Sequence, residues 1–383
     1  MALTAYTYVG YPALAALLAR RQQAGTAADD DLPSVSVVVS ALDERDVIGR
    51  RLDNLRELDY PEDLLEVVVV TDGSSDGTDV EARRHAWPGV VVLHDPRRRG
   101  KAAAMGRGVA CATHEVVVFS DANNSYAPDA LREVVRPLAD PRVGAVTGAK
   151  AVDGGESTLS GGEKLYWRYE SFIKRQESLL GCCTGVVGEL LAVRRDLVPE
   201  FPKDLVNDDF FIAMHVARSG RRVAYAPAAM SWEPAAISMS DDVVRRRRMT
   251  AGRWQSLVRW RSVLPVGQPL VIWQVVSHKY LRLLLPFSMG TALVAGWAAV
   301  ARSSGDRRTL RGLTLAQTAF YGLAAVGGAV PVSAGPIRSA ALGARYLTRT
   351  NLASAEGLVA YLRGRRSLHL WARVPRSQDT SGP

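Results

Sequence analysis

Three short acidic segments of this 383-residue chain have the residue types of a catalytic site: DGSSDGT at 72–78, DAN at 121–123 and NDD at 207–209. Alternate residues of an extended segment point to one side, so Asp121 and Asn123 could share a Mg²⁺ or Mn²⁺ ion with phosphate oxygens. Asp72 could accept the imide N–H of uracil, because the glycines beside it allow a base to approach closely. The alternatives are an Asx turn at Asp72 and a strand-terminal turn at 121–123.

The third segment contains two neighbouring aspartates that could have different functions. Asp208 and Asp209 precede an apolar-periodic run, residues 210–216, that predicts a helix. Either carboxylate could cap this helix, and the other could serve as a general base.

Basic residues supply the complementary charge. Lys101 follows three arginines and a glycine and begins a predicted helix, which suits a diphosphate. Residues 245–248 are four consecutive arginines, of which one or two can face a single ligand. The net charge is +9, and the segment from Arg338 onward has eight arginines against two acidic residues. This distribution favours an anionic membrane surface over nucleic acid as the partner.

The elements that must position these residues alternate between strands and helices. Continuous β-branched runs such as 67–70 predict strands buried on both faces. Strands alternating with helices predict a mostly parallel α/β sheet, whose ligands bind beyond the carboxyl ends of the strands. The predicted strands are 35–40, 65–71, 90–94, 115–120, 143–148 and 222–226, and the predicted helices are 46–58, 79–86, 101–113 and 128–138.

The ends of the chain predict membrane segments. Residues 2–19 carry no charge and precede two arginines, which favours a transmembrane anchor with its C-terminal end inside over a secretory signal. Further apolar stretches are long enough to span a bilayer. The predicted organisation is an anchor (1–21), a cytosolic catalytic block (31–262), an interfacial helix (267–282), two transmembrane helices (283–333) and a basic interfacial helix and tail (338–383).

Other cofactor and cysteine sites receive little support. No GxGxxG follows the first predicted strand and no P-loop motif occurs. The sequence therefore gives weak support for a dinucleotide-binding domain or a P-loop nucleotide site. Three cysteines, two of them adjacent, suggest neither a disulfide framework nor a zinc site and favour a reduced, cytoplasmic setting.

Taken in order, the segments resemble the family-2 glycosyltransferases of GT-A fold, in particular bacterial membrane-embedded enzymes similar to cellulose, chitin and hyaluronan synthases. Five motifs carry this resemblance, flanked by apolar segments at 7–12 and 277–287: DGSSDGT, RRGKAAAMGRG (98–108), FSDAN (119–123), NDD and the arginine-rich helix.

The resemblance implies a role for each matching position. Asp209 would be the catalytic base, and Asn123 would occupy the metal-coordinating position beside Asp121. Arg248 would contact the diphosphate if the family's Gln-x-x-Arg-Trp motif aligns with 245–249; the alternative alignment, 250–254, keeps Arg-Trp and loses Gln. The nucleotide-binding residues would be Ala41, Glu44, Asp72, Lys101, Asp121 and Arg248, and the acceptor-side residues Asp208, Met249 and Trp254.

The implied function is inverting transfer of a sugar from a UDP-sugar to a growing polysaccharide or glycan acceptor. It would take place at the cytoplasmic face of the inner (plasma) membrane, with Mg²⁺ or Mn²⁺ as cofactor. Met249 stands where the family has a tryptophan that stacks on the acceptor sugar, and methionine has no flat π surface. This substitution favours a second hypothesis, a non-processive enzyme that adds one sugar to a lipid-linked acceptor. A third hypothesis is a non-catalytic, nucleotide-binding assembly subunit. The oligomeric state is left open.

Overall fold

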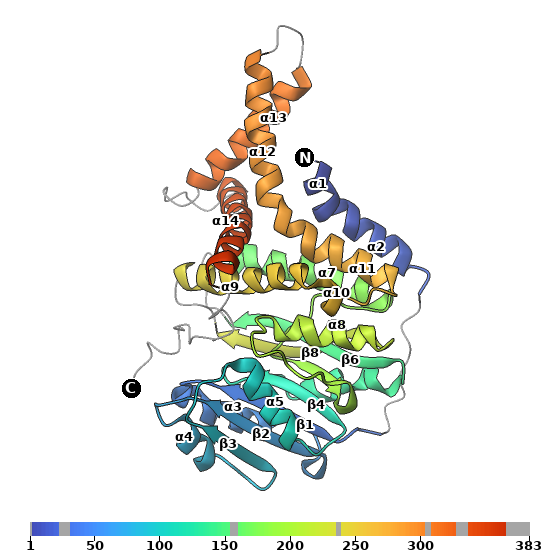
Figure 1. Ribbon diagram of the computed structural model, residues 1–383, viewed down its shortest axis with the longest axis vertical. Coiled ribbons are helices and arrows are strands. Elements are labelled where there is room, and N and C mark those ends of the chain that lie inside the picture. Colours follow the sequence, from blue (N-terminus) through green and yellow to red (C-terminus); the bar gives the residue numbers. More distant parts are fainter. Residues whose placement is uncertain are drawn as a thin grey trace.

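The computed structural model describes residues 2–22, 31–153, 160–234, 239–302, 308–326 and 336–364. A sheet with helices on its faces forms the block at the bottom of Figure 1, and long helices extend away from it at the top. A layer that contains α7 (Ser160–Leu179), α9 (Met239–Val258) and α11 (Pro269–Val275) lies between these two parts. The sheet-containing block is therefore joined to the apolar helices through a helical layer.

One eight-stranded sheet forms the block, in the order β3-β2-β1-β4-β7-β6-β8-β5. Its first four strands in this order are parallel, whereas β7 runs antiparallel to both of its neighbours. The strands are β1 (Val35–Ala41), β2 (Leu65–Asp72), β3 (Val90–Asp95), β4 (Val116–Asp121), β5 (Ser125–Tyr126), β6 (Val143–Asp153), β7 (Leu191–Arg194) and β8 (Arg222–Pro234). The predicted α/β, mostly parallel sheet is confirmed, and β5 and β7 were not predicted.

Helices between the strands cover both faces of the sheet. The four predicted helices are present, the last of them as α6 followed by a short 3₁₀ turn at Arg136–Ala139. The helices of the block are α3 (Arg45–Arg56), α4 (Thr78–Arg84), α5 (Lys101–Cys111), α6 (Ala130–Val135) and α8 (Asp208–Arg218), and α10 (Trp260–Val263) follows α9.

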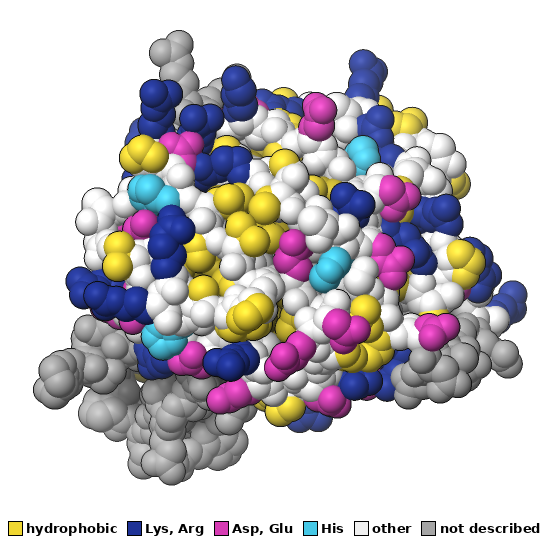
Figure 2. Space-filling model, turned by 90° about the horizontal axis from the view of Figure 1, so that it is seen from below, with side chains coloured by type: hydrophobic (Ala, Val, Ile, Leu, Met, Phe, Trp, Pro, Cys, Tyr) yellow, Lys and Arg dark blue, Asp and Glu magenta, His cyan; other side chains and the backbone are white. Residues whose placement is uncertain are grey.

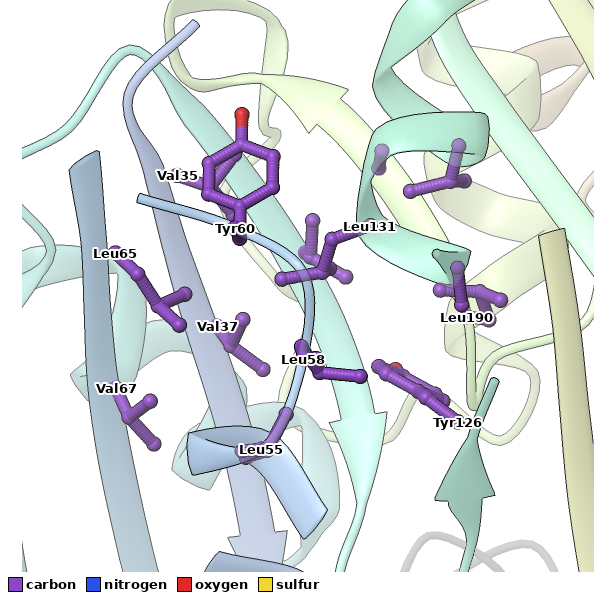
Figure 3. Close-up of a cluster of buried hydrophobic side chains, with 14 of the residues drawn as sticks. Val35, Val37, Leu55, Leu58, Tyr60, Leu65, Val67, Tyr126, Leu131 and Leu190 are labelled. Carbon is purple, nitrogen blue, oxygen red and sulfur yellow. The ribbon is translucent and has the colours of Figure 1, made fainter. Parts of the chain in front are cut away.

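The β-branched strands have a core on each side. Val37 and Val39 of β1 pack into one hydrophobic cluster, while Val38 between them packs into the other. All three side chains are buried, as expected of a strand covered on both faces. Figure 3 shows part of the first cluster, in which Leu131 of α6 and Tyr126 lie beside the strands. The sheet is thus held rigidly, which fixes the positions of the residues at its edge.

Within the described ranges, two helical runs are long and apolar enough to cross a membrane: Ala2–Ala19 and Pro269–Arg302. The first comprises α1 (Ala2–Ala5), a π turn (Tyr6–Gly10) and α2 (Tyr11–Ala19). The second runs from α11 through the π turn η5 (Val276–Tyr280) into α12 (Leu281–Arg302). The predicted boundary between an interfacial and a membrane helix at 282/283 therefore falls inside one continuous helical run.

The region after α12 differs in part from the predicted pattern. Helix α13 (Arg308–Val326) covers much of the predicted third span but is not among the runs that are long and apolar enough to cross a membrane. Helix α14 (Pro336–Arg363) covers the first part of the segment predicted as a basic interfacial helix and tail, 338–383. It packs on α9, where Gly357 lies so close to Thr250 that a Cβ would be 2.6 Å away. The basic tail from 365 onward lies outside the described residues. On the face seen from below, basic and acidic side chains are interspersed (Figure 2).

Candidate active site

The carboxyl ends of β1, β2 and β4 bring three of the predicted residues to one edge of the sheet. Ala41 and Asp72 are the last residues of β1 and β2, and Asp121 is the last residue of β4, paired in register with Ser40. Parallel strands place their carboxyl ends at the same edge. The structure therefore places Ala41, Asp72 and Asp121 at the same edge.

Asp72 is fully buried and holds the turn before α5. Its two carboxylate oxygens accept hydrogen bonds from the backbone N–H groups of Arg99 and Gly100, at 2.7–3.1 Å, and the Arg107 guanidinium lies 3.0 Å from Oδ1. Gly100 adopts φ +95°, a conformation that side chains rarely adopt. Asp72 thereby fixes where α5 begins and where Lys101 lies. A hydrogen bond from Asp72 to a base remains a prediction, and it would have to be exchanged for one of these contacts.

Glu44, predicted to line the nucleoside pocket, is also buried. Its backbone N–H donates to the Thr78 hydroxyl, and the Asp43 carboxylate accepts the N–H of Ser75. These bonds tie the segment after β1 to the glycine-rich segment after β2. The two segments that were predicted to bind the nucleoside are thus joined to each other by hydrogen bonds.

Lys101 joins the edge of the sheet to the start of α8. Its Nζ lies 2.8 Å from Asp121 Oδ1 and 3.4 Å from Asp208 Oδ2. Burial disfavours the charge on Lys101, but the two carboxylates outweigh it and raise the pKa of Lys101. Arg248 lies close enough to oppose that charge. Lys101, Asp121 and Asp208, far apart in the sequence, therefore form one charged cluster, and the charge of Arg248 acts on it.

Asp209 is the second residue of α8, directly beside this cluster. Asn207 occupies the cap position, without a side-chain cap hydrogen bond, and Asp209 Oδ1 accepts the N–H of Phe210 at 2.7 Å. Burial, followed by repulsion from Asp208, raises the pKa of Asp209 to about 6. A carboxylate with this pKa can both lose and accept a proton near neutral pH, as a general base must.

Asp209 faces a small pocket of about 60 Å³. The pocket is bounded by the segment before β7, by α8, by α9 and by η5, and its lining residues are Thr184, Val186, Asn207, Asp209, Phe210, Met249, Arg253, Ser256, Lys279 and Tyr280. Helix α9 approaches closely because Gly252 has no side chain; a Cβ there would lie 2.3 Å from Asn207 Oδ1. The pocket therefore lies directly beside the Asp209 carboxylate.

The predicted acceptor-side residues, Asp208, Met249 and Trp254, have different surroundings in the structure. Met249 lines the pocket, whereas Trp254 does not, and its indole N–H donates to the Ser354 carbonyl of α14. Asp208 is turned to Lys101. Arg253, which the preferred motif alignment left unused, lines the pocket instead. Sequence reasoning also missed Lys279, since nothing local indicates that η5 closes this pocket.

The predicted metal ligands lie at the end of β4. The side chain of Asp121 is 34% exposed. Burial acts to raise the pKa of Asp121, but the charge of Lys101 and its hydrogen bond outweigh burial, so the pKa is lowered. The Asn123 amide donates to Glu233 Oε1 at 3.4 Å. One carboxylate and one amide oxygen suit Mg²⁺ or Mn²⁺, but among the described residues no group of three or more His, Cys, Asp or Glu could hold a metal ion. The donor set thus fits a cation that takes most of its ligands from a bound diphosphate.

A buried polar network connects the pocket to the apolar helices. Glu177 of α7 is completely buried and accepts hydrogen bonds from the Tyr11 hydroxyl at 2.5 Å and from the Thr184 N–H at 2.9 Å. His278 of η5 lies between Glu177 and Glu170, with ring nitrogens 2.7 and 3.0 Å from their oxygens. Because Thr184 lines the pocket, the network sets the pocket wall relative to both apolar runs.

The comparisons with known proteins agree with this geometry. Residues 36–200 match the family model "Glycosyl transferase family 2". The chain is 25% identical over 237 residues to poly-β-1,6-N-acetyl-D-glucosamine synthase of Staphylococcus aureus, covering 60% of this chain and 54% of the relative. It is 24% identical over 262 residues to the synthase of Staphylococcus epidermidis, covering 66% and 59%. The chain thus spans little more than half the length of these curated relatives.

A solved structure is similar over almost the whole chain. It is the mannosyltransferase PcManGT from Pyrobaculum calidifontis in complex with GDP-Man and Mn²⁺. It superposes with a TM-score of 0.72 at 29% identity, covering 94% of this chain and 97% of that chain. The fold is GT-A-like, and residues 36–200 within the block are similar to glycosyl transferase family 2.

Proposed function

We propose that the chain is a membrane-associated, inverting glycosyltransferase that moves a sugar from a nucleoside diphosphate sugar, first of all a UDP-sugar, to a glycan acceptor. The observation that carries this proposal is the placement of Asp209. It lies in a pocket, has its pKa raised to about 6, and adjoins the Lys101–Asp121 pair at the edge of the sheet.

The reaction is a single in-line displacement. The acceptor hydroxyl loses its proton to Asp209, its oxygen attacks the anomeric carbon, and the bond to the diphosphate oxygen breaks. Lys101 and Arg248 place positive charge where the diphosphate leaves. A divalent cation held by Asp121 and Asn123 would supply further positive charge to the diphosphate when bound. Asp72 supports the step by holding the segment that positions Lys101.

Two donors deserve a direct comparison. The resemblance of the motifs favours a UDP-sugar, whereas the similar mannosyltransferase structure contains GDP-Man and Mn²⁺. We expect transfer from one nucleotide class only, since the loops around Ala41, Glu44 and Asp72 must contact the base. Product formation by the full chain in detergent, with UDP-GlcNAc, UDP-glucose and GDP-mannose and with Mg²⁺ or Mn²⁺, decides between them.

The acceptor side favours addition of one sugar. Met249 lines the pocket, and Trp254 is directed to α14, so neither provides a flat surface for a sugar there. Polymer formation is the second candidate, supported by the similarity to the staphylococcal synthases. Sizing of radiolabelled product separates the two, because a polymerase gives a ladder and a single-addition enzyme gives one species.

The assignment of Asp209 is tested by Asp209→Asn. We expect transfer to fall by at least a hundredfold, because the base is lost, while the Kd for the donor nucleotide changes less than twofold. Normal turnover of this variant would refute the assignment. Absence of transfer and of donor hydrolysis by the unmodified chain with every donor would favour the non-catalytic alternative.

Location at the cytoplasmic face of the plasma membrane follows from the same proposal. Two apolar helical runs support membrane association. The block would lie on the side where nucleotide sugars are made. Protease accessibility of residues 31–262 in right-side-out and inverted vesicles tests this orientation: cleavage in inverted vesicles only is expected, and cleavage from the outside would contradict it.

A further inference from the structure

The pocket beside Asp209 contains two cationic side chains, Arg253 of α9 and Lys279 of η5, against a single carboxylate. Among the described residues neither Arg253 nor Lys279 has a hydrogen-bond or ion-pair partner for its side chain. Other lysines near the sheet differ in this respect: Lys101 is paired with Asp121 and Lys150 with Glu189. The pocket thus has two cations for one lining carboxylate, and neither cation forms a direct ion pair among the described residues.

This arrangement is unfavourable without a ligand. Arg253 lies close enough to Lys279 to repel its charge, and both side chains are half-buried. Glu170 and Glu177 offset part of the charge on Lys279, but neither forms an ion pair with it. Partly buried like charges destabilise the folded state, and a cleft with an excess of one sign of charge concentrates the opposite ion. Tyr280, which is 5% exposed, also lines the pocket; its hydroxyl lies near Ser256 but makes no hydrogen bond among the described residues. Arg253, Lys279 and the Tyr280 hydroxyl therefore have no direct hydrogen-bond or ion-pair partner among the described residues.

We propose that this pocket binds a phosphate or diphosphate ester of the acceptor, with Arg253 and Lys279 as its counter-charges and the Tyr280 hydroxyl as a further donor. The inference rests on the proposed function, whose acceptor it specifies. Guanidinium and ammonium groups bind phosphate oxygens well, arginine with two parallel hydrogen bonds.

The position of the pocket favours a lipid-linked ester over a soluble one. Lys279 and Tyr280 belong to η5, inside the apolar run Pro269–Arg302. A phosphate at this point would lie where the block meets the apolar helices, so an attached hydrocarbon chain could follow α12. The donor diphosphate has its own cations, Lys101 and Arg248, beside Asp121. The pocket cations are therefore assigned to the acceptor.

The test is a binding measurement on the full chain in detergent, with the donor nucleotide at saturation. The probes are farnesyl diphosphate, farnesol and inorganic pyrophosphate, compared by calorimetry. We expect farnesyl diphosphate to bind at least tenfold more tightly than farnesol and than pyrophosphate. The double variant Arg253→Gln/Lys279→Gln should reduce the preference over farnesol to less than twofold. The matched control is Arg247→Gln, an exposed arginine of α9 that does not line the pocket, which should keep the preference.

Several results would overturn the inference. Equal binding of farnesol, or an unchanged preference in the double variant, would show that the two cations do not recognise phosphate. Pyrophosphate binding as tightly as farnesyl diphosphate would show a soluble-anion site. Displacement of farnesyl diphosphate by the donor nucleotide would assign the cations to the donor. Should the double variant fail to fold, Lys279→Gln alone must still weaken farnesyl diphosphate binding severalfold. None of these measurements needs turnover, so failure here is separate from failure of the Asp209 test.

Discussion

The pKa of Asp209 gives the sharpest prediction, because its two causes can be separated by one substitution. Burial and then Asp208 raise it from 3.8 to about 6, a difference that corresponds to about 3 kcal/mol. The base must be ionised to accept a proton, so kcat/KM should fall about tenfold for each pH unit below 6. Asp208→Asn removes the neighbouring negative charge but leaves the burial. Because burial is the larger cause, we expect the acidic limb to move down by less than half of the total difference, or roughly 1 pH unit at most.

The assay is the pH profile of kcat/KM between pH 4.5 and 8.5 with the donor that the panel selects. The matched control is Asp204→Asn, which removes a carboxylate that pairs with Arg259 away from the pocket. In Asp204→Asn the acidic limb of the pH profile should lie at the same pH as in the unmodified chain. An acidic limb that stays in place in Asp208→Asn, or that moves to higher pH, would refute the electrostatic account of Asp209. A profile without any acidic limb would refute Asp209 as the base.

Two further predictions concern the metal site and the buried network. Asn123→Asp should lower the Mn²⁺ concentration for half-maximal activity about tenfold, equal to ~1.4 kcal/mol, and should lower Tm in EDTA because the new carboxylate faces Glu233; an unchanged Mn²⁺ titration would place the cation elsewhere. Glu177→Ala should reduce the free energy of unfolding by about 3–5 kcal/mol, since it removes the buried partner of Tyr11, Thr184 and His278. Chemical denaturation in detergent measures this loss, and a loss under 1 kcal/mol would mean that the network is not holding these elements together.

The sequence predicts the edge of the sheet well because its signals are local. A buried strand followed directly by a carboxylate identifies Asp72 and Asp121 without reference to any other element. The same holds for Asp208 and Asp209 before the apolar run of α8. Since parallel strands end at one edge, the convergence of these residues with Lys101 could be inferred before the fold was known.

The remaining features depend on contacts between distant segments. Strand β7 has four residues, too few for a periodic pattern, and it is defined by its antiparallel pairing with β4 and β6. Arg253 and Lys279 line the pocket of Asp209 because Gly252 lets α9 approach α8 and because η5 forms part of the pocket wall. The choice between two motif alignments on α9 likewise depends on the helix orientation, which directs Trp254 to α14. Sequence periodicity does not contain that information.

The hydrogen bond between Tyr11 and Glu177 has a consequence for truncation of the chain at its N-terminus. Tyr11 packs with Ala15 and Ile173 and covers a carboxylate that has no contact with solvent. A chain that starts after this helix would keep every residue proposed for catalysis, yet Glu177 would lose a donor and its apolar cover. The N-terminal helix is thus part of the same folded unit as the pocket, and its removal should produce a protein that fails to maintain the pocket rather than a soluble form with an intact pocket.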